Sequence, residues 1–319
     1  MRNLKQFIFS FLGTIALTLS PLSATEYKFA DIETGIKILS DDDEFLTAMN
    51  PIEIALRVGS PTADKTIEDL KAHYAANVIE WPEAEKALMK ALLVTHKKKL
   101  AKIEHLLPET VYFIKVTNEV ESGISHTRGN AFVSPQRRSS ISTKLFFHQI
   151  FHIMSRHSRI KRASLYNIIN FRPCYFQPTK DVEQYSVKNP EAPFTEFFVP
   201  VEIEDRDTYV MTYLHTKHDG FDPTIKGGFD GHITGDLIEV TVNDGICKPV
   251  IKADGKPSIY KHEEVPSFYD QVGRNTNFDI HPEEIIADNF AFLMMGKKDL
   301  INPDIPEDIE EWLDVEIEN

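Results

Sequence analysis

The stretch KLFFHQIFHIMSRH, residues 144–157, contains no glycine or proline and is rich in apolar side chains. Such a segment favours a helix that is buried in the fold. Within it, His148 and His152 are four residues apart, so one helical turn brings both imidazole rings to the same face. Two imidazoles at this spacing can bind one metal ion. The alternative is that they are ordinary core histidines.

A second predicted helix, residues 282–295, carries acidic side chains in an apolar setting. It reads PEEIIADNFAFLMM, with proline at an early position and Gly296 just after its end. Glu284 and Asp288 are four residues apart and share a face. Carboxylates among apolar residues are costly to bury unless they are paired or bind a cation. The alternative is that Glu283, Glu284 and Asp288 lie on an exposed helix start, where acidic groups complement the helix dipole.

Together the two segments predict a site for one zinc ion, Zn²⁺. His148 and His152 supply two nitrogen ligands, and Glu284 supplies a carboxylate as the third. Asp288 is expected to accept the ring N–H of a liganding histidine and so to fix its orientation. Glu283 lies about 100° around the helix from Glu284, so we expect it to point away from the site.

Both segments resemble a known family. Residues 148–156, HQIFHIMSR, resemble the active-site helix of gluzincin-type zinc metallopeptidases, whose motif is H-E-x-x-H with a downstream glutamate ligand. Residues 281–290, HPEEIIADNF, are similar to the ligand helix H-P-E-E-I-x-A-[D/E]-N-F of a group of poorly characterised exported bacterial zincins. The resemblance extends from about Val111 to Met295, and residues 128–131, RGNA, resemble the approach to the edge strand of a zincin cleft. It implies a zincin-like α+β fold, with a twisted sheet packed on the active-site helix, and a peptide or protein as substrate or ligand.

The chain departs from the family pattern in two ways. His152 and Glu284 are 132 residues apart, so the inserted region must fold back to complete the site. Gln149 occupies the position of the glutamate that takes a proton from water and delivers it to the leaving amine, and glutamine does not titrate. We therefore expect a zinc-binding protein impaired in peptide hydrolysis. The alternatives are a non-catalytic protein that binds peptide or cell-envelope polymer in the former cleft, and a structural exported protein without a metal.

The remaining chain predicts an α+β fold with the metal site in its second part. Helical patterns cover residues 66–106 and 160–170, and strand patterns cover 110–119, 129–134, 208–214 and 237–242. The last two runs form a strand-rich insertion between the two metal-binding helices. The predicted regions are a mainly helical one at 25–109, a zincin-like domain at 110–296 and an acidic C-terminal tail at 297–319.

The N-terminus predicts export. Arg2 and Lys5 precede an apolar run at residues 7–19, and small residues ending at Ala24 offer a cleavage site, as in a signal peptide of residues 1–24. A retained anchor is the alternative, but the run is short of the roughly 20 residues that span a bilayer. We expect a periplasmic or secreted protein with no stable membrane anchor after cleavage.

Charge and cysteine content narrow the partners further. The formal net charge is −14, and an acidic protein repels phosphate backbones, so no nucleic acid is expected as a partner. Cys174 and Cys247 can pair in an oxidising compartment or remain free thiols.

Four residues near the metal-binding segments are candidates to stabilise an oxyanion, each with a structural role as the alternative: His232, Tyr260, His262 and His281.

Overall fold

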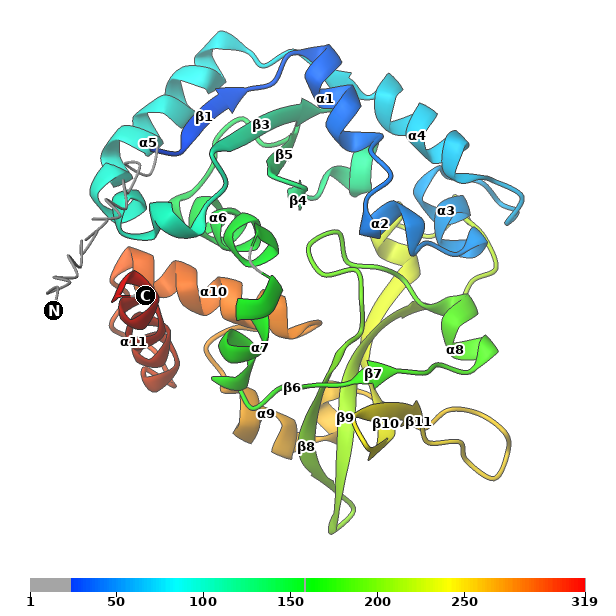
Figure 1. Cartoon of the computed structure of the whole chain (residues 1–319). Coiled ribbons are helices and arrows are strands. Elements are labelled where there is room, and N and C mark those ends of the chain that lie inside the picture. Colours follow the sequence, from blue (N-terminus) through cyan, green and yellow to red (C-terminus); the bar gives the residue numbers. More distant parts are fainter. Residues whose placement is uncertain (1–23, 158, 319) are drawn as a thin grey trace, which may run out of the picture.

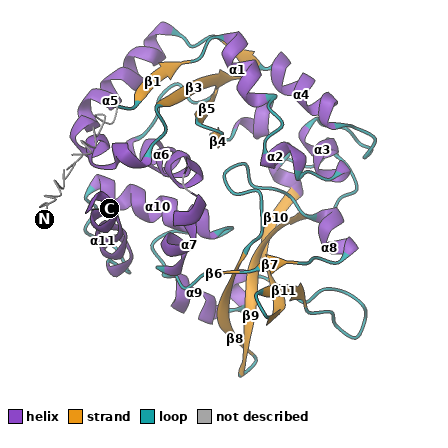
Figure 2. Cartoon of the chain, in the orientation of Figure 1, coloured by secondary structure: helices purple, strands orange, loops and turns teal. Residues whose placement is uncertain are grey.

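The computed structural model describes residues 24–157 and 159–318, which form a mixed α+β fold (Figures 1 and 2). The signal peptide predicted for residues 1–24 lies almost wholly outside the described residues and stays a prediction. Within the described part of the chain, no helix combines the length and the apolar character needed to cross a bilayer.

The first sheet has three parallel strands and a short antiparallel strand at each edge. Its strand order is β1-β3-β5-β4, where β1, β3 and β5 run parallel and β4 is antiparallel to β5; a short β2 continues the edge beyond β1 by pairing with the end of β3. The bounds are β1 Glu26–Phe29, β2 Val78–Ile79, β3 Thr110–Val116, β4 His126–Arg128 and β5 Ala131–Pro135. The strands predicted at residues 110–119 and 129–134 are therefore confirmed.

Helices cover both faces of this sheet. Side chains of β3 alternate between the two faces, so they pack into two different cores. Val111 and Phe113 enter the main core, while Ile114 and Val116 enter a second core. The second core lies against the N-terminal helices α1 Ile32–Leu39, α2 Glu44–Thr47, α3 Pro51–Arg57 and α4 Ile67–Ala76. The helical pattern predicted at 66–106 corresponds to α4 and α5 Glu83–Ile103, with β2 between them.

The main core joins the first sheet to α6 Thr143–His157 and α10 Pro282–Met295, the helices that carry the predicted ligands. It also includes side chains of α7 Arg159–Asn167 and α11 Asp304–Glu318. In Figure 1, α6 lies beneath the sheet and α10 lies beneath α6. The helices predicted at 144–157 and 282–295 are confirmed, and α10 ends at Gly296 in the left-handed conformation. The acidic C-terminal segment contains α11, which buries Ile305, Ile309 and Leu313 in the core while its acidic side chains stay largely exposed.

A second sheet, built from residues between α7 and α9, lies at the lower right of Figure 1. Its strand order is β6-β8-β9-β10-β11-β7, with β12 also pairing with β10. The bounds are β6 Arg172–Pro173, β7 Tyr175–Phe176, β8 Phe197–Ile203, β9 Arg206–Thr216, β10 Ile233–Asn243, β11 Ile246–Pro249 and β12 Ile259–Tyr260; the short helices are α8 Lys180–Tyr185 and α9 Pro266–Val272. The strands predicted at 208–214 and 237–242 lie within β9 and β10.

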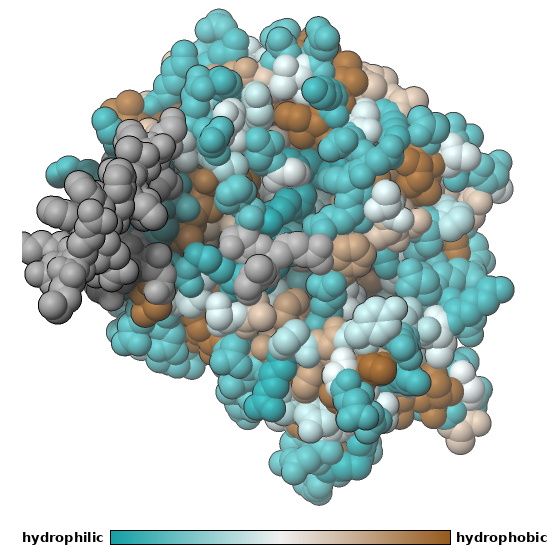
Figure 3. Space-filling model, in the orientation of Figure 1, coloured by the Kyte–Doolittle hydropathy of each residue, from teal (hydrophilic) through white to brown (hydrophobic). Residues whose placement is uncertain are grey.

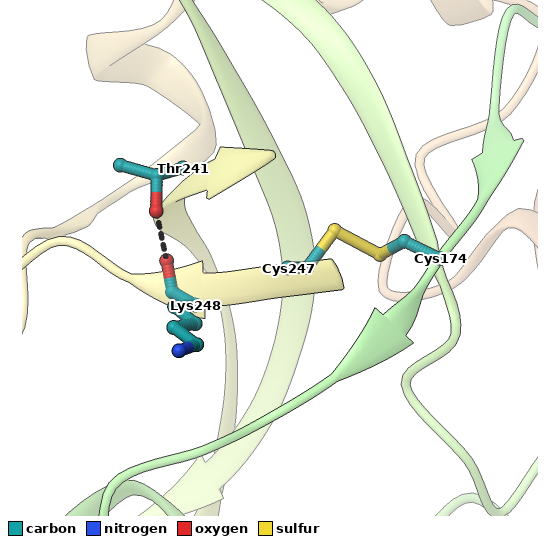
Figure 4. The surroundings of a disulfide bond; sticks show 4 residues. All are labelled: Cys174, Thr241, Cys247 and Lys248. Atoms are coloured by element: carbon teal, nitrogen blue, oxygen red, sulfur yellow. Dashed lines mark hydrogen bonds between the residues drawn. A yellow bond between two sulfur atoms is a disulfide. The ribbon is translucent and has the colours of Figure 1, made fainter. Parts of the chain in front are cut away.

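A disulfide fixes the two edges of the second sheet to each other. β6 and β7 stand at opposite ends of the strand order, yet only Cys174 separates them in the chain. Cys174 is bonded to Cys247 of β11, with the two Cα atoms 5.9 Å apart (Figure 4). Of the two alternatives for these cysteines, pairing is the one that the structure contains.

The outer surface agrees with the acidic, polar composition. On the face shown in Figure 3, hydrophilic residues predominate and hydrophobic residues are scattered among them.

Candidate metal centre

Three predicted ligands from two helices converge in the interior. His148 and His152 on α6 and Glu284 on α10 are 7%, 0% and 2% exposed. Glu284 Oε2 lies 3.1 Å from His148 Nε2 and 3.4 Å from His152 Nε2, and one donor atom from each residue lies within 4.8 Å of the others. Two ligands of a tetrahedral zinc ion, each about 2.0–2.1 Å from the metal, are about 3.3–3.4 Å apart. This buried group can therefore hold a metal ion.

The second nitrogen of each histidine ring is held by a different carboxylate. His148 Nδ1 lies 2.9 Å from Asp288 Oδ1, and His152 Nδ1 lies 2.9 Å from Glu283 Oε1. If each Nδ1 donates its N–H to its carboxylate, both Nε2 lone pairs face Glu284, which is the tautomer that a metal requires. His152 Nε2 is buried and has no hydrogen-bond partner among the described residues. A cation between the ligands would satisfy this atom.

Glu283 is part of the site, so the expectation that it points away is wrong. It is fully buried and, besides His152, accepts hydrogen bonds from Ser155 Oγ at 2.7 Å and from the Tyr166 hydroxyl. Arg162 Nε lies 4.0 Å from Glu283 Oε2 and donates to Ser155 Oγ. Glu283 therefore has its donors on the far side of His152 and does not reach the cavity described below.

Asp288 lies where the sequence analysis expects it, against the first histidine. Its second oxygen, Oδ2, accepts hydrogen bonds from Lys144 Nζ at 2.8 Å and from the Thr276 hydroxyl. Burial raises the pKa of Asp288, but the hydrogen bonds to His148 and Lys144 outweigh it and hold the pKa below its usual value. Since Glu283, Glu284 and Asp288 are all buried, the alternative of an exposed helix start is excluded.

Without a metal, the histidines and Glu284 stabilise one another's charges. Burial lowers the pKa of His152, but the charge of Glu284 and the hydrogen bond to Glu283 outweigh it and raise the pKa to about 10. Burial and the charge of His152 lower the pKa of His148, yet hydrogen bonds to Asp288 and Glu284 leave it raised. Glu284 has its pKa well below the usual range, because His152 and His148 outweigh the effect of burial.

A cavity of about 120 Å³ opens beside the ligand group. His148, Gln149 and Glu284 line it together with the apolar side chains Ile124, Val187, Leu214, Phe229, Ile233, Phe278 and Ile280 and with further polar residues, Arg57, Glu121, Ser125, His126, Lys188, Asn189, Glu191 and Asp230. Gln149 Oε1 is buried there without a hydrogen-bond partner among the described residues, and so is the hydroxyl of Ser125. Gln149 therefore faces the space next to His148 and Glu284.

Sequence reasoning missed a loop that completes this cavity. Asn189 Nδ2 donates to Glu284 Oε1 at 2.7 Å, which orients the carboxylate that faces the histidines. Asn189 Oδ1 also accepts the backbone N–H of Glu191 at 3.1 Å, and the Glu191 side chain lines the cavity. The loop connects α8 to β8 and carries no motif, so only the three-dimensional arrangement reveals it.

The four candidates for oxyanion stabilisation do not line the cavity. His232 bonds to Gly228 and Asp222 of its own loop, and His281 caps the start of α10 by accepting from the Glu283 N–H. Tyr260 bonds to Ser258, and His262 packs on an aromatic ring of α9. None of the four is therefore placed to stabilise an oxyanion in this cavity.

Comparisons with known protein families, with curated proteins and with solved structures gave no match.

Proposed function

We propose that the chain is an exported zinc-binding protein of the gluzincin metallopeptidase type, with a zincin-like fold, that is impaired in peptide hydrolysis because Gln149 stands in place of the general base. The observation that carries the proposal is the ligand group, in which Glu284 Oε2 lies 3.1 and 3.4 Å from the two Nε2 atoms. Two imidazoles and a carboxylate are a donor set typical of catalytic zinc, with a fourth position left for water or substrate.

The arrangement of the carboxylates supports zinc over a purely structural polar cluster. A buried cluster that serves only stability needs each polar atom hydrogen-bonded within the protein, whereas His152 Nε2 lies 3.4 Å from Glu284 Oε2 without a hydrogen bond. Glu283 and Asp288 each hold one Nδ1, which is the common second-layer arrangement around metal-bound histidines. When bound, zinc supplies Lewis-acid polarisation of a carbonyl group and lowers the pKa of water.

The chain's own residues would orient a substrate in the cavity. The apolar wall accommodates an apolar side chain, and 120 Å³ is small beside the roughly 300–1,000 Å³ of typical ligand pockets. Gln149 Oε1 and Ser125 Oγ are free to bond to a peptide group. The cost of losing the base at position 149 is roughly 10²- to 10⁴-fold in rate, or about 3–5 kcal/mol in the barrier.

A second function, binding of a peptide or cell-envelope polymer without cleavage, is favoured by one specific observation. The buried carboxamide of Gln149 has an unpartnered oxygen in the cavity, where it can accept an N–H from a ligand but cannot take up a proton. Tight ligand binding that is unchanged by metal removal would support this function over hydrolysis.

The substitution Gln149→Glu tests the proposal. We expect the zinc-loaded variant to cleave internally quenched peptides with apolar residues at least 10²-fold faster than the wild type, and a chelator to abolish the gain. The matched control is Gln177→Glu, which introduces the same charge at an exposed position, between β7 and α8 in the chain. If Gln149→Glu binds zinc but gains no hydrolysis, the non-catalytic function is the better account.

A further inference from the structure

We propose, on the basis of the function above, that the residual hydrolysis left after loss of the base at position 149 uses the Glu191 carboxyl group to accept and return the proton, a role that the family assigns to the residue at position 149. Glu191 is 5% exposed and lines the same cavity as Gln149 and Glu284. It comes from the loop between α8 and β8, not from the motif helix.

Hydrogen bonds fix Glu191 at three points. Its backbone N–H donates to Asn189 Oδ1, and its backbone oxygen accepts from Arg162 Nη2 at 3.2 Å. Its side-chain Oε1 accepts the backbone N–H of Thr127, on edge strand β4, at 2.8 Å. The second oxygen, Oε2, receives no hydrogen bond from the described residues. One oxygen therefore holds the carboxyl group in place while the other is available to a proton.

The other titratable groups of the cavity are engaged or unsuited. Both oxygens of Glu121 accept hydrogen bonds, one from Tyr74 and one from Arg57. Lys188 is hydrogen-bonded to Ser186, and Asp230 lies exposed at the rim. The remaining three groups are His126, whose pKa is lowered to about 3 by burial, and the pair His148 and Glu284, which contact each other at 3.1 Å. Glu191 is thus the carboxyl group left for proton transfer.

The electrostatic surroundings are consistent with this role. Burial raises the pKa of Glu191 to about 7; the positive charge of His152 lowers it, Glu284 raises it, and Arg156 on α6 lowers it.

The proposed step is hydrolysis of an amide bond. The water oxygen forms a bond to the carbonyl carbon while one water proton passes to Glu191. That proton then passes to the amine nitrogen as the C–N bond breaks, which leaves an acid, an amine and an ionised Glu191. The step needs no oxidant, reductant or further reactant.

The test is Glu191→Gln in the full chain, with Glu191→Asp as the conservative variant and the exposed Glu202→Gln as a matched control. In zinc-loaded protein, we expect Glu191→Gln to lower kcat/KM for the quenched peptides by at least 10²-fold and to abolish the acid limb of the pH profile. Glu191→Asp should retain part of the rate, and Glu202→Gln should match the wild type. A wild type without chelator-sensitive hydrolysis, or a Glu191→Gln variant with more than about a tenth of the wild-type rate, would overturn the proposal.

A second test of the proposal needs neither metal nor substrate. Carboxyl titration of metal-free protein by ¹³C NMR should show one group with a midpoint near pH 7 in the wild type and none in Glu191→Gln; its persistence in the variant contradicts the assignment. Glu191→Gln should still bind one zinc ion per chain, because Glu191 is not a ligand and holds neither Nδ1 of the two histidines. A wild-type protein that binds no zinc would instead refute the proposed function. Normal zinc binding and an active Gln149→Glu variant, together with an inert wild type, would refute the role of Glu191 alone.

Discussion

Replacement of Glu283 by glutamine should weaken zinc binding although Glu283 is not a ligand. The side chain is fully buried, and its Oε1 lies 2.9 Å from Nδ1 of His152. Glutamine keeps the size of the side chain and one oxygen acceptor but removes the negative charge that polarises the ring and faces Arg162. Loss of such a second-layer partner costs roughly 10- to 100-fold in metal affinity, or about 1.4–2.7 kcal/mol.

The assay is competition for zinc against a chromophoric chelator at pH 7, with the unfolding free energy of the metal-free protein measured in parallel. The parallel measurement separates a change in the site from a change in folding. Asp288→Asn should weaken binding to a similar extent, because Asp288 holds Nδ1 of His148 at the same distance of 2.9 Å. Glu307→Gln, which removes the same charge from an exposed position on α11, should leave the affinity unchanged. A folded Glu283→Gln protein with wild-type zinc affinity would refute the reasoning.

Three predictions concern stability. Replacing Cys174 and Cys247 by serine should lower the unfolding free energy by about 4 kcal/mol, because the bond closes a long loop with a sequence separation of 73; denaturant titration yielding less than 1 kcal/mol would count against this. Burial lowers the pKa of His126 to about 3, below its unfolded value, so the unfolded chain binds that proton more readily. Its contribution to stability therefore falls as the pH drops below about 6.5, by up to about 1.4 kcal/mol per pH unit, and His126→Asn should make the measured pH dependence shallower; equal slopes would contradict the assignment. Ile309→Ala on α11 should cost about 2–5 kcal/mol, whereas Leu88→Ala, exposed on α5, should cost little; similar unfolding midpoints would argue that α11 is not part of the core.

The two ligand helices could be predicted because their local signals agree with their tertiary role. The run at residues 144–157 lacks helix breakers, and the run at 282–295 has proline at its first position and Gly296 at its left-handed end. A helix-wheel argument then failed for Glu283, because α10 is buried on nearly all sides and 100° of rotation still leaves a side chain facing α6. The side chain of Glu283 therefore still contacts the His152 ring.

Loop positions and remote pairings were not accessible from the sequence. Asn189 and Glu191 lie in a segment without periodicity, and their place beside Glu284 depends on how β8 and α8 pack. The pairing of Cys174 with Cys247 likewise depends on the sheet bringing its two edges together. Neither the amino-acid composition nor the net charge determines whether these residues lie close together.

The most direct test of the central claim is the metal content of purified protein, combined with X-ray absorption at the metal edge. The account predicts one zinc ion per chain, coordinated by two imidazoles and one carboxylate, and loss of that ion in both His148→Ala and Glu284→Gln. A protein that binds no zinc, that binds iron in its place, or that keeps its zinc in either variant would contradict it.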